Sequence, residues 1–147
     1  MGNYYILPIM IKDHEKIEQL LNTLEKDMDK DFKTMKKSFH NFEWELEKHI
    51  FIEEKAIFTY YSPTDTSYGY KMLPLVTKQH NYILNMLNNW RKDIVKNHFI
   101  SNITELKEFI IKHKEYEEKE LYPKLDESVD ENEKKHIIDK IGQIIEK

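Results

Sequence analysis

Apolar side chains recur every three or four residues along almost the whole chain, which is the spacing of amphipathic α-helices. Only 3 Gly and 4 Pro interrupt the 147 residues, so few positions force a helix to stop. The pattern predicts an all-α bundle in a single domain spanning residues 1–147. The expected helices cover residues about 9–29, 31–60, 70–96, 100–122 and 130–146, the last being a short C-terminal addition to the bundle.

Two breaks in this pattern organise the chain. Residues 61–69 contain Ser62-Pro63 and several hydroxyl side chains, a composition typical of a loop, and they divide the chain into two halves of two long helices each. Pro123 is expected to end the fourth helix, because proline has no backbone N–H to donate.

Composition and charge exclude several classes of protein. The absence of Cys removes disulfide frameworks, zinc–thiolate and iron–sulfur sites, and thiol nucleophiles. The net charge is −4, and Arg91 is the single Arg among 23 basic residues, which argues against binding to nucleic acid. No apolar stretch is long enough for a membrane span or a signal peptide, so a cytoplasmic location is expected.

The two halves repeat each other, and the repeat includes their histidines. An offset of 64 residues superimposes His113 on His49 and Glu117 on Glu53. An offset of 66 superimposes His80 on His14, so each half has one His on its first helix and a His-x-x-x-Glu-Glu motif on its second. The candidate metal ligands that share this repeat are His14, His49, Glu53, His80, His113 and Glu117.

This set of side chains has the chemistry of a metal centre. Residues four apart on a helix point in nearly the same direction, so each His and its Glu enter the bundle interior together. Buried polar groups without partners would each cost about 2 kcal/mol or more, and a pair of metal ions would satisfy all six at once. Mixed nitrogen and oxygen ligation with bridging carboxylates favours a di-iron or di-manganese centre over structural zinc, and iron is the first choice.

Each piece of the motif has a plainer interpretation when it is taken alone. A His-x-x-x-Glu pair often only supports an exposed helix, and a lone His on an apolar stripe is more often a hydrogen-bonded core residue. The registered repeat of all six residues outweighs both alternatives. The histidines without a counterpart, which are His40, His98 and His136, are interpreted as surface or interfacial residues. Trp44, Trp90 and the Phe residues are expected in the core.

The motifs resemble the two half-repeats of hemerythrin-like, HHE cation-binding domains over residues about 9–125. They read His14, His49-Ile-Phe-Ile-Glu53-Glu54, His80, and His113-Lys-Glu-Tyr-Glu117-Glu118 followed by Leu121-Tyr122-Pro123. The resemblance implies an up-down-up-down four-helix bundle around two iron ions with an oxo or hydroxo bridge. It also implies that His14 and His49 hold one iron, that His80 and His113 hold the other, and that Glu53 and Glu117 bridge them.

Two departures from the oxygen-carrying hemerythrins bear on function. Those proteins have a His-x-x-x-His pair on the third helix, but Val76 and Leu84 flank His80 here, so a more open site with one His fewer is expected. Glu18 and Glu45 are also expected at one level beside the metals. They are either a solvent-facing pair near lysines or an acidic pair that favours oxidase, peroxidase or nitric-oxide chemistry.

The resemblance implies a protein that binds iron and, through it, dioxygen or a related small diatomic molecule, for oxygen binding, storage or sensing. An enzyme-like alternative acts on nitric oxide or peroxide, or supplies iron for the repair of Fe–S clusters. Neither nucleic acid nor a membrane is expected as a partner, and the sequence indicates no particular protein partner.

Overall fold

The computed structural model describes residues 5–60 and 69–145, and every regular element in these residues is helical. This confirms the all-α prediction. The α-helices are α1 (Ile6–Asp27), α2 (Phe32–Ile52), α3 (Gly69–Val95), α4 (Ile103–Tyr116), α5 (Tyr122–Ser128) and α6 (Glu131–Ile145). The π-helical turns η1 (Glu53–Ile57) and η3 (Glu117–Leu121) follow α2 and α4, and the 3₁₀ turn η2 (Phe58–Tyr60) follows η1. The predicted loop lies outside the described residues except for Gly69, which begins α3.

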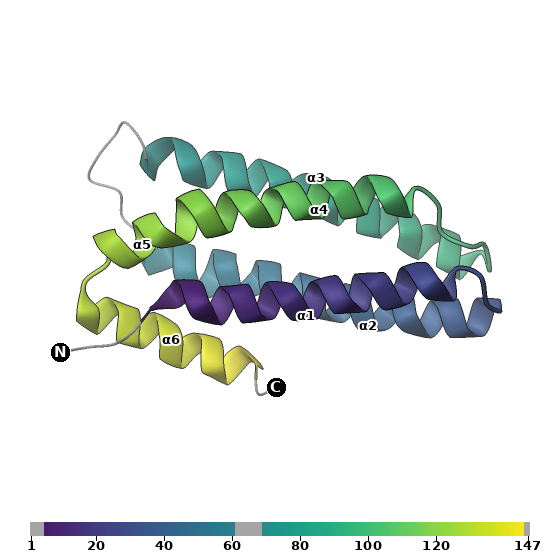
Figure 1. The fold of residues 1–147 in the computed structure, drawn as a ribbon, viewed down its shortest axis with the longest axis horizontal. Coiled ribbons are helices and arrows are strands. Elements are labelled where there is room, and N and C mark those ends of the chain that lie inside the picture. Colours follow the sequence, from purple (N-terminus) through teal and green to yellow (C-terminus); the bar gives the residue numbers. More distant parts are fainter. Residues whose placement is uncertain (1–4, 61–68, 146–147) are drawn as a thin grey trace.

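Four long helical rods lie side by side along the long axis of the molecule (Figure 1). The first is α1, the second is α2 with η1 and η2, the third is α3, and the fourth is α4 with η3 and α5. α1 packs against α2 and α4, and α3 packs against the same two helices. α6 returns along α1 and α2 at the end of the rods that contains α5. The turns that join the rods have local signals: Asp31 accepts a hydrogen bond from the N–H of Thr34 at the start of α2. Asn97 and Asn102 adopt the left-handed conformation that asparagine tolerates between α3 and α4.

The helical path continues through Pro123, so the prediction that this proline ends the fourth helix is wrong. Pro123 lies in the first turn of α5, where a backbone N–H needs no intrahelical acceptor and its loss costs no hydrogen bond. The preceding π turn makes this register possible, because the N–H of Tyr122 donates five residues back, to the carbonyl of Glu117. The path therefore runs from α4 through η3 into α5 and ends at Ser128.

Both π turns begin at the glutamate of the repeated motif, Glu53 in η1 and Glu117 in η3. A π turn widens a helix by one residue and is frequent at functional sites. Because the same distortion occurs at the same motif position in both halves, the repeat found in the sequence is also a repeat of local structure.

Two apolar clusters fill the interior and are separated by the level of the repeated histidines. On α1, for example, Met10 precedes His14 in one cluster and Ile17 follows it in the other. Trp90 is buried as predicted and donates its indole N–H to the carbonyl of Ser101 at 2.8 Å. The polar centre is thus enclosed between two dry layers along the rods.

The prediction of a core position is wrong for Trp44 and for some of the Phe residues. Trp44 is 61% exposed and Phe51 is 51% exposed, although both lie on α2. They are seven residues apart and share an outer face of that helix, away from the buried stripe that includes Phe42 and Leu46.

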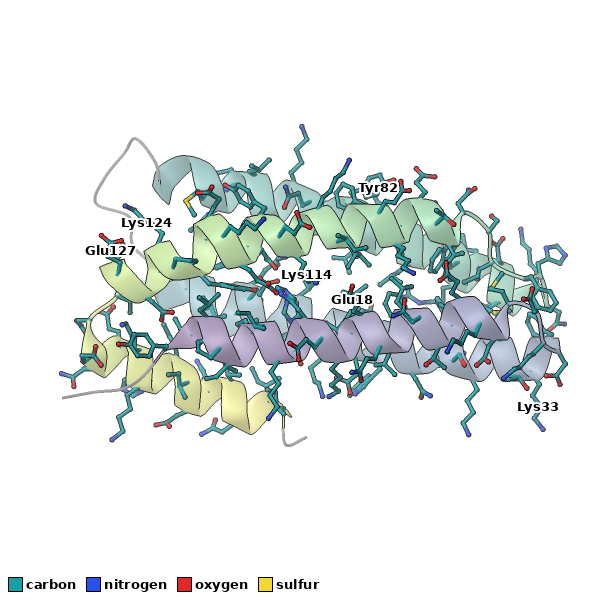
Figure 2. All side chains as sticks on the ribbon, viewed as in Figure 1. Glu18, Lys33, Tyr82, Lys114, Lys124 and Glu127 are labelled. Carbon is teal, nitrogen blue, oxygen red and sulfur yellow. The ribbon has the colours of Figure 1, made fainter. Side chains whose placement is uncertain are left out.

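Charged side chains cover much of the outer surface of the described chain. In Figure 2, Lys33, Lys124 and Glu127 point away from the rods, whereas Glu18 and Lys114 lie between α1 and α4. The three histidines without a repeat counterpart are exposed, which confirms their surface interpretation: His40, His98 and His136. Within residues 5–60 and 69–145, no helix combines the length and apolar character needed to cross a membrane.

Candidate metal centre

Six buried side chains from the four rods meet at one level. The helices α1 to α4 contribute one histidine each, and the two π turns contribute one glutamate each. The exposed fractions of all six side chains lie between 0% and 7%. They are the six residues that the sequence repeat selected, namely His14, His49, Glu53, His80, His113 and Glu117. The structure therefore brings every candidate ligand to the same buried place.

Glu117 lies between a histidine of the first half and a histidine of the second. Its Oε1 atom is 3.0 Å from Nε2 of His14, and its Oε2 atom is 3.2 Å from Nε2 of His113. The remaining imidazoles are slightly farther away, with Nε2 of His49 at 3.9 Å and Nε2 of His80 at 3.7 Å. Glu117 is thus the carboxylate that reaches all four imidazoles.

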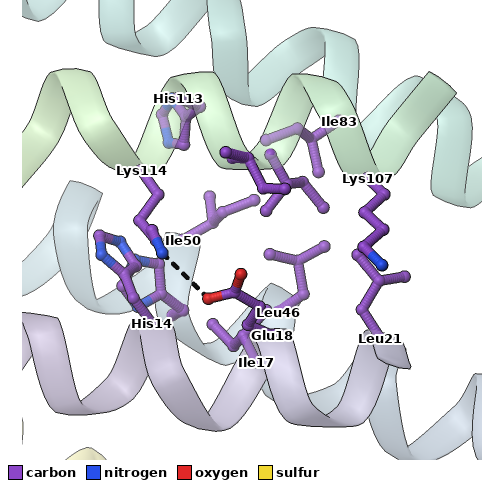
Figure 3. A pocket seen from close by; sticks show the side chains of 13 residues that line it. His14, Ile17, Glu18, Leu21, Leu46, Ile50, Ile83, Lys107, His113 and Lys114 are labelled. Carbon is purple, nitrogen blue, oxygen red and sulfur yellow. Dashed lines mark hydrogen bonds and ion pairs between the residues drawn. The ribbon is translucent and has the colours of Figure 1, made fainter. Parts of the chain in front are cut away.

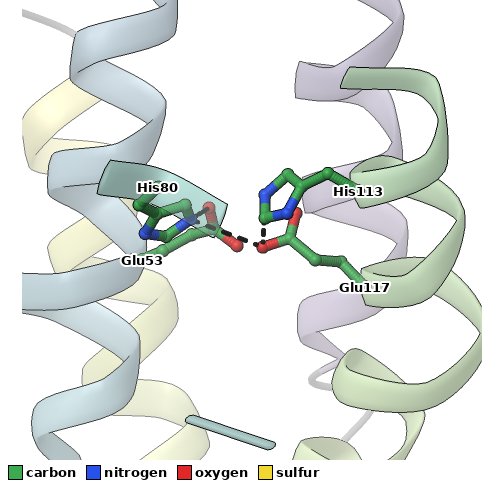
Figure 4. Close-up of side chains that lie close together, drawn as sticks. All are labelled: Glu53, His80, His113 and Glu117. Carbon is green, nitrogen blue, oxygen red and sulfur yellow. Dashed lines mark hydrogen bonds and ion pairs between the residues drawn. The ribbon is translucent and has the colours of Figure 1, made fainter. Parts of the chain in front are cut away.

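Glu53 makes the matching contacts from the opposite side. Its Oε1 atom is 3.0 Å from Nε2 of His80 and 3.3 Å from Nε2 of His49. Figure 4 shows Glu53 and Glu117 facing each other across the interior, with His80 and His113 beside them. Each carboxylate therefore joins a histidine from one half of the chain to a histidine from the other.

The donor atoms form two overlapping groups in which all atoms lie within 4.8 Å of one another. The larger group is Glu53, His80, His113 and Glu117, and the smaller group is His14, His49 and Glu117. Among the described residues, Nε2 of His49 and Oε2 of Glu117 are buried and make no hydrogen bond. Buried polar atoms without partners cost about 1–3 kcal/mol each, and cations would satisfy them. The nitrogen and oxygen donors fit first-row transition metals.

The outward-facing Nδ1 atom of every histidine has its own acceptor. The four contacts run from His14 to Glu118 (2.7 Å), from His49 to Asp13 (2.5 Å), from His80 to Glu54 (2.8 Å) and from His113 to Gln79 (2.6 Å). An Nδ1–H that donates outward leaves the Nε2 lone pair directed at the carboxylates, which is the tautomer that a metal ligand needs. The histidines are therefore oriented for metal binding from both sides of the ring.

Sequence reasoning missed these acceptors as partners of the histidines. The repeat contained a signal, because Glu118 matches Glu54 at the offset of 64 and Gln79 matches Asp13 at the offset of 66. Their positions beside the motif histidines could have suggested a supporting role. The histidine that each one supports follows from the packing of neighbouring helices, which spacing along the chain does not specify.

A sequence comparison agrees with this geometry. The family model of the hemerythrin HHE cation-binding domain matches residues 5–125. The chain belongs to this hemerythrin family. The matched range includes α1 to α4 and all six buried ligand candidates, so the hemerythrin domain of this chain is a cation-binding domain. No curated protein and no solved structure shows significant similarity to the chain.

The hemerythrin centre also includes a phenol that the repeat does not duplicate. The hydroxyl of Tyr122 lies 2.5 Å from Oε2 of Glu53 and 3.2 Å from Oε1 of Glu117, and it donates hydrogen bonds to these carboxylates. Burial and the two negative charges raise the pKa of Tyr122 well above its usual range, which keeps it a neutral donor. Its counterpart in the first half is Phe58, whose ring stacks on His80 at 6.3 Å.

Tyr122→Phe is expected to lower the free energy of unfolding of the metal-free protein by about 1–3 kcal/mol, because it removes a donor from a buried carboxylate. Phe58 occupies the equivalent position, so the ring without its hydroxyl should fit. Denaturant unfolding measures the effect, and Tyr82→Phe is the matched control because the Tyr82 hydroxyl donates to Glu105 at an exposed site. Equal losses in the two variants would contradict a special role for the buried phenol.

Electrostatics in the metal-free centre favour imidazolium–carboxylate pairs. Burial would lower the pKa of His49, but the charge of Glu53, the hydrogen bond to Asp13 and the nearby carboxylate of Glu117 raise it well above its usual range. Burial likewise opposes the charge on His80, but Glu117 and Glu53 raise its pKa to about 10. Burial would raise the pKa of Glu117, whereas its contacts with Glu53 and His113 hold it well below its usual range. Protons therefore occupy the places that cations would take.

A small cavity lies against one side of the centre, where α1 and α4 face each other. The volume that the centre of a water-sized molecule can occupy is about 20 Å³, so the cavity has room for one such molecule. His14, His49 and His113 form its polar wall, and most of the remaining lining is Leu and Ile. Glu18 also lines the cavity and pairs with Lys114 at 2.9 Å (Figure 3).

Of the two interpretations of Glu18 and Glu45, the structure supports the pair near lysines, because each carboxylate has its own lysine partners. Glu45 is 2.9 Å from Nζ of Lys16 and 3.3 Å from Nζ of Lys48, and it does not line the cavity beside the histidines. Long lysine side chains from α1, α2 and α4 reach these carboxylates. Only Glu18 has a place beside the candidate metal centre.

Proposed function

We propose that this hemerythrin-family chain binds two iron ions in its interior. One ion would lie at the His14–His49 position and the other at the His80–His113 position, with Glu53 and Glu117 shared between them. The observation that carries this proposal is the convergence of four imidazole Nε2 atoms on two buried carboxylates, with Nε2 of His49 and Oε2 of Glu117 left without hydrogen bonds. An up-down-up-down course of the four rods is part of the proposal, and the short turns after α1 and α3 support it.

The function that this centre would serve is the binding of dioxygen or a related small molecule. A di-iron centre, when bound, supplies the electrons and the open coordination position that such ligands require. The chain supplies an adjoining space for one small molecule, walled by His14, His49 and His113. Leu and Ile make most of the remaining wall of that space apolar, as reversible ligand binding needs.

A second candidate is an enzyme-like protein that acts on nitric oxide or peroxide, or that supplies iron for Fe–S repair. The observation that favours reactive chemistry is the Glu18–Lys114 ion pair in the cavity wall. A carboxylate and an ammonium group beside a bound ligand can supply protons to it. The equivalent positions in the other half of the repeat are Leu84 and Ile50, so this polar pair occurs on one side of the centre only.

The Glu18→Leu/Lys114→Ile double variant, which copies the other half, is expected to prolong the life of any oxygen-bound form. If this second candidate holds, the wild-type protein should instead oxidise rapidly in air, because the ion pair places proton donors beside the ligand. Optical spectra recorded after air is added to the reduced, iron-loaded protein measure both rates. Glu45→Gln is the control, since Glu45 faces lysines outside this cavity. Identical oxidation rates in the double variant and the wild type would assign the ion pair no part in the chemistry.

The proposed function is tested by an anaerobic optical titration of the reduced, iron-loaded protein with dioxygen, nitric oxide and peroxide. A carrier or sensor should bind dioxygen with a stoichiometry of one and release it under vacuum. Consumption of nitric oxide or peroxide with turnover would support the enzyme-like alternative. A spectrum that no ligand changes would contradict both.

A further inference from the structure

The hydrogen bonds that support the histidines differ between the two halves of the repeat in one respect. His14 and His80, on the first helix of each half, donate to Glu118 and Glu54, which are equivalent carboxylates. The second-helix histidines donate to the residues that immediately precede those first-helix histidines. His49 donates to Asp13 and His113 donates to Gln79, so one has an anionic acceptor and the other a neutral amide.

The two glutamates on the inner side of the histidines show no such difference between the two metal positions. Glu117 lies within 3.2 Å of one histidine from each metal position, His14 and His113. Glu53 likewise lies within 3.3 Å of His49 and His80, one from each position. With both carboxylates shared, each position has two imidazoles and the same two glutamates. Among the groups that hydrogen-bond to the imidazoles, the difference in charge between the two positions is therefore that between Asp13 and Gln79.

We propose that Asp13 makes the His14–His49 position the tighter of the two metal positions, with Gln79 leaving the His80–His113 position weaker. This inference rests on the proposed two-metal function and specifies which ion is held first. In this account Asp13 and Gln79 are positioning residues, because they act on the metal through His49 and His113.

The physical reason is the effect of an anionic acceptor on an imidazole. A carboxylate that accepts the Nδ1–H bond draws the proton toward itself and increases the electron density at Nε2, which strengthens the bond to a cation. Asp13 is only 8% exposed, so water screens its charge poorly, and it also adds a negative charge near the ion. The amide of Gln79 orients His113 but supplies no net charge.

Donor proximity alone gives the opposite order. Glu53, His80, His113 and Glu117 already form the larger compact group, which would favour the His80–His113 position for the first ion. Small rotations of the glutamate side chains can bring their oxygens closer to either position when an ion binds. No such rotation removes the negative charge of Asp13. The order of filling therefore separates the two explanations.

The test is a calorimetric titration of the metal-free protein with Co²⁺. The wild type should show two steps, and Asp13→Asn should weaken the tighter step by about 10- to 100-fold, the usual effect of removing such a supporting group. Gln79→Glu should tighten the weaker step and leave the other unchanged. Both replacements nearly preserve side-chain shape, and circular dichroism checks that each variant remains helical.

Repulsion between two cations also produces two steps, so single-histidine variants assign them. His113→Ala should keep the tight step and His49→Ala should lose it, and the Asp13→Asn/Gln79→Glu exchange should reverse this dependence. An Asp13→Asn variant with unchanged steps, or a tight step that survives in His49→Ala but not in His113→Ala, would overturn the inference. If the wild type binds two Co²⁺ ions, either of these two outcomes would still leave the proposed two-metal function intact. No Co²⁺ binding at all would overturn that function as well.

Discussion

Glu117→Gln is expected to leave the protein unable to hold two metal ions at once. Glu117 reaches all four imidazoles, at 3.0 Å from His14 and 3.2 Å from His113 and within 3.9 Å of the other two. An amide preserves the volume of the side chain but removes the charge that two cations share. We expect the metal content to fall from two ions to one or none per chain, as measured by elemental analysis after reconstitution.

The same replacement should destabilise the metal-free protein, because it leaves buried imidazolium groups without their central anion. Removing one partner from a buried ion pair typically costs about 3–5 kcal/mol. Glu115→Gln is the matched control, since Glu115 lies on the exposed side of α4 two residues away. If Glu117→Gln and Glu115→Gln both retained two ions and wild-type stability, Glu117 would not be a shared ligand.

The stability of the metal-free protein is expected to fall as the pH rises from 6 to 9. The pKa of His80 is raised from 6.5 to about 10, so the protonated ring contributes stability that is fully present below 6.5 and is lost as the pH rises through about 10. His49 shifts in the same direction. Denaturant unfolding at a series of pH values measures the slope, and His80→Gln should flatten it.

Metal binding should show the opposite dependence on pH. The imidazoles must lose their protons before Nε2 can bind a cation, so affinity should increase between pH 6 and 9 and binding should release protons near neutral pH. The lowered pKa of Glu117 keeps this carboxylate ionised through that range. A pH-stat titration counts the protons released. If metal affinity and the stability of the metal-free protein changed with pH in the same direction, metal ions would not be replacing protons on the histidines.

The sequence predicted the helical class and the buried site because both depend on periodicity. A repeat with two offsets identified six residues, and all six lie between 0% and 7% exposed in one cluster. The spacing of apolar residues at three or four positions likewise predicted most ends of the four rods to within a few residues.

The parts that the sequence did not predict depend on contacts between helices or on departures from regular helix geometry. The continuation through Pro123 requires the π turn η3, which apolar spacing does not reveal. The exposure of Trp44 depends on how far the neighbouring helices cover α2. The support of His49 by Asp13 requires α1 and α2 to pack in one register, which the position of Asp13 beside His14 in the sequence does not reveal.

Anaerobic reconstitution with Fe²⁺ followed by iron analysis tests directly whether the six side chains hold two iron ions. We expect about two iron ions per chain in the wild type, and fewer in both His49→Ala and His113→Ala when these variants remain folded. Failure of the wild type to retain iron, or two ions per chain in both variants, would contradict the two-iron proposal.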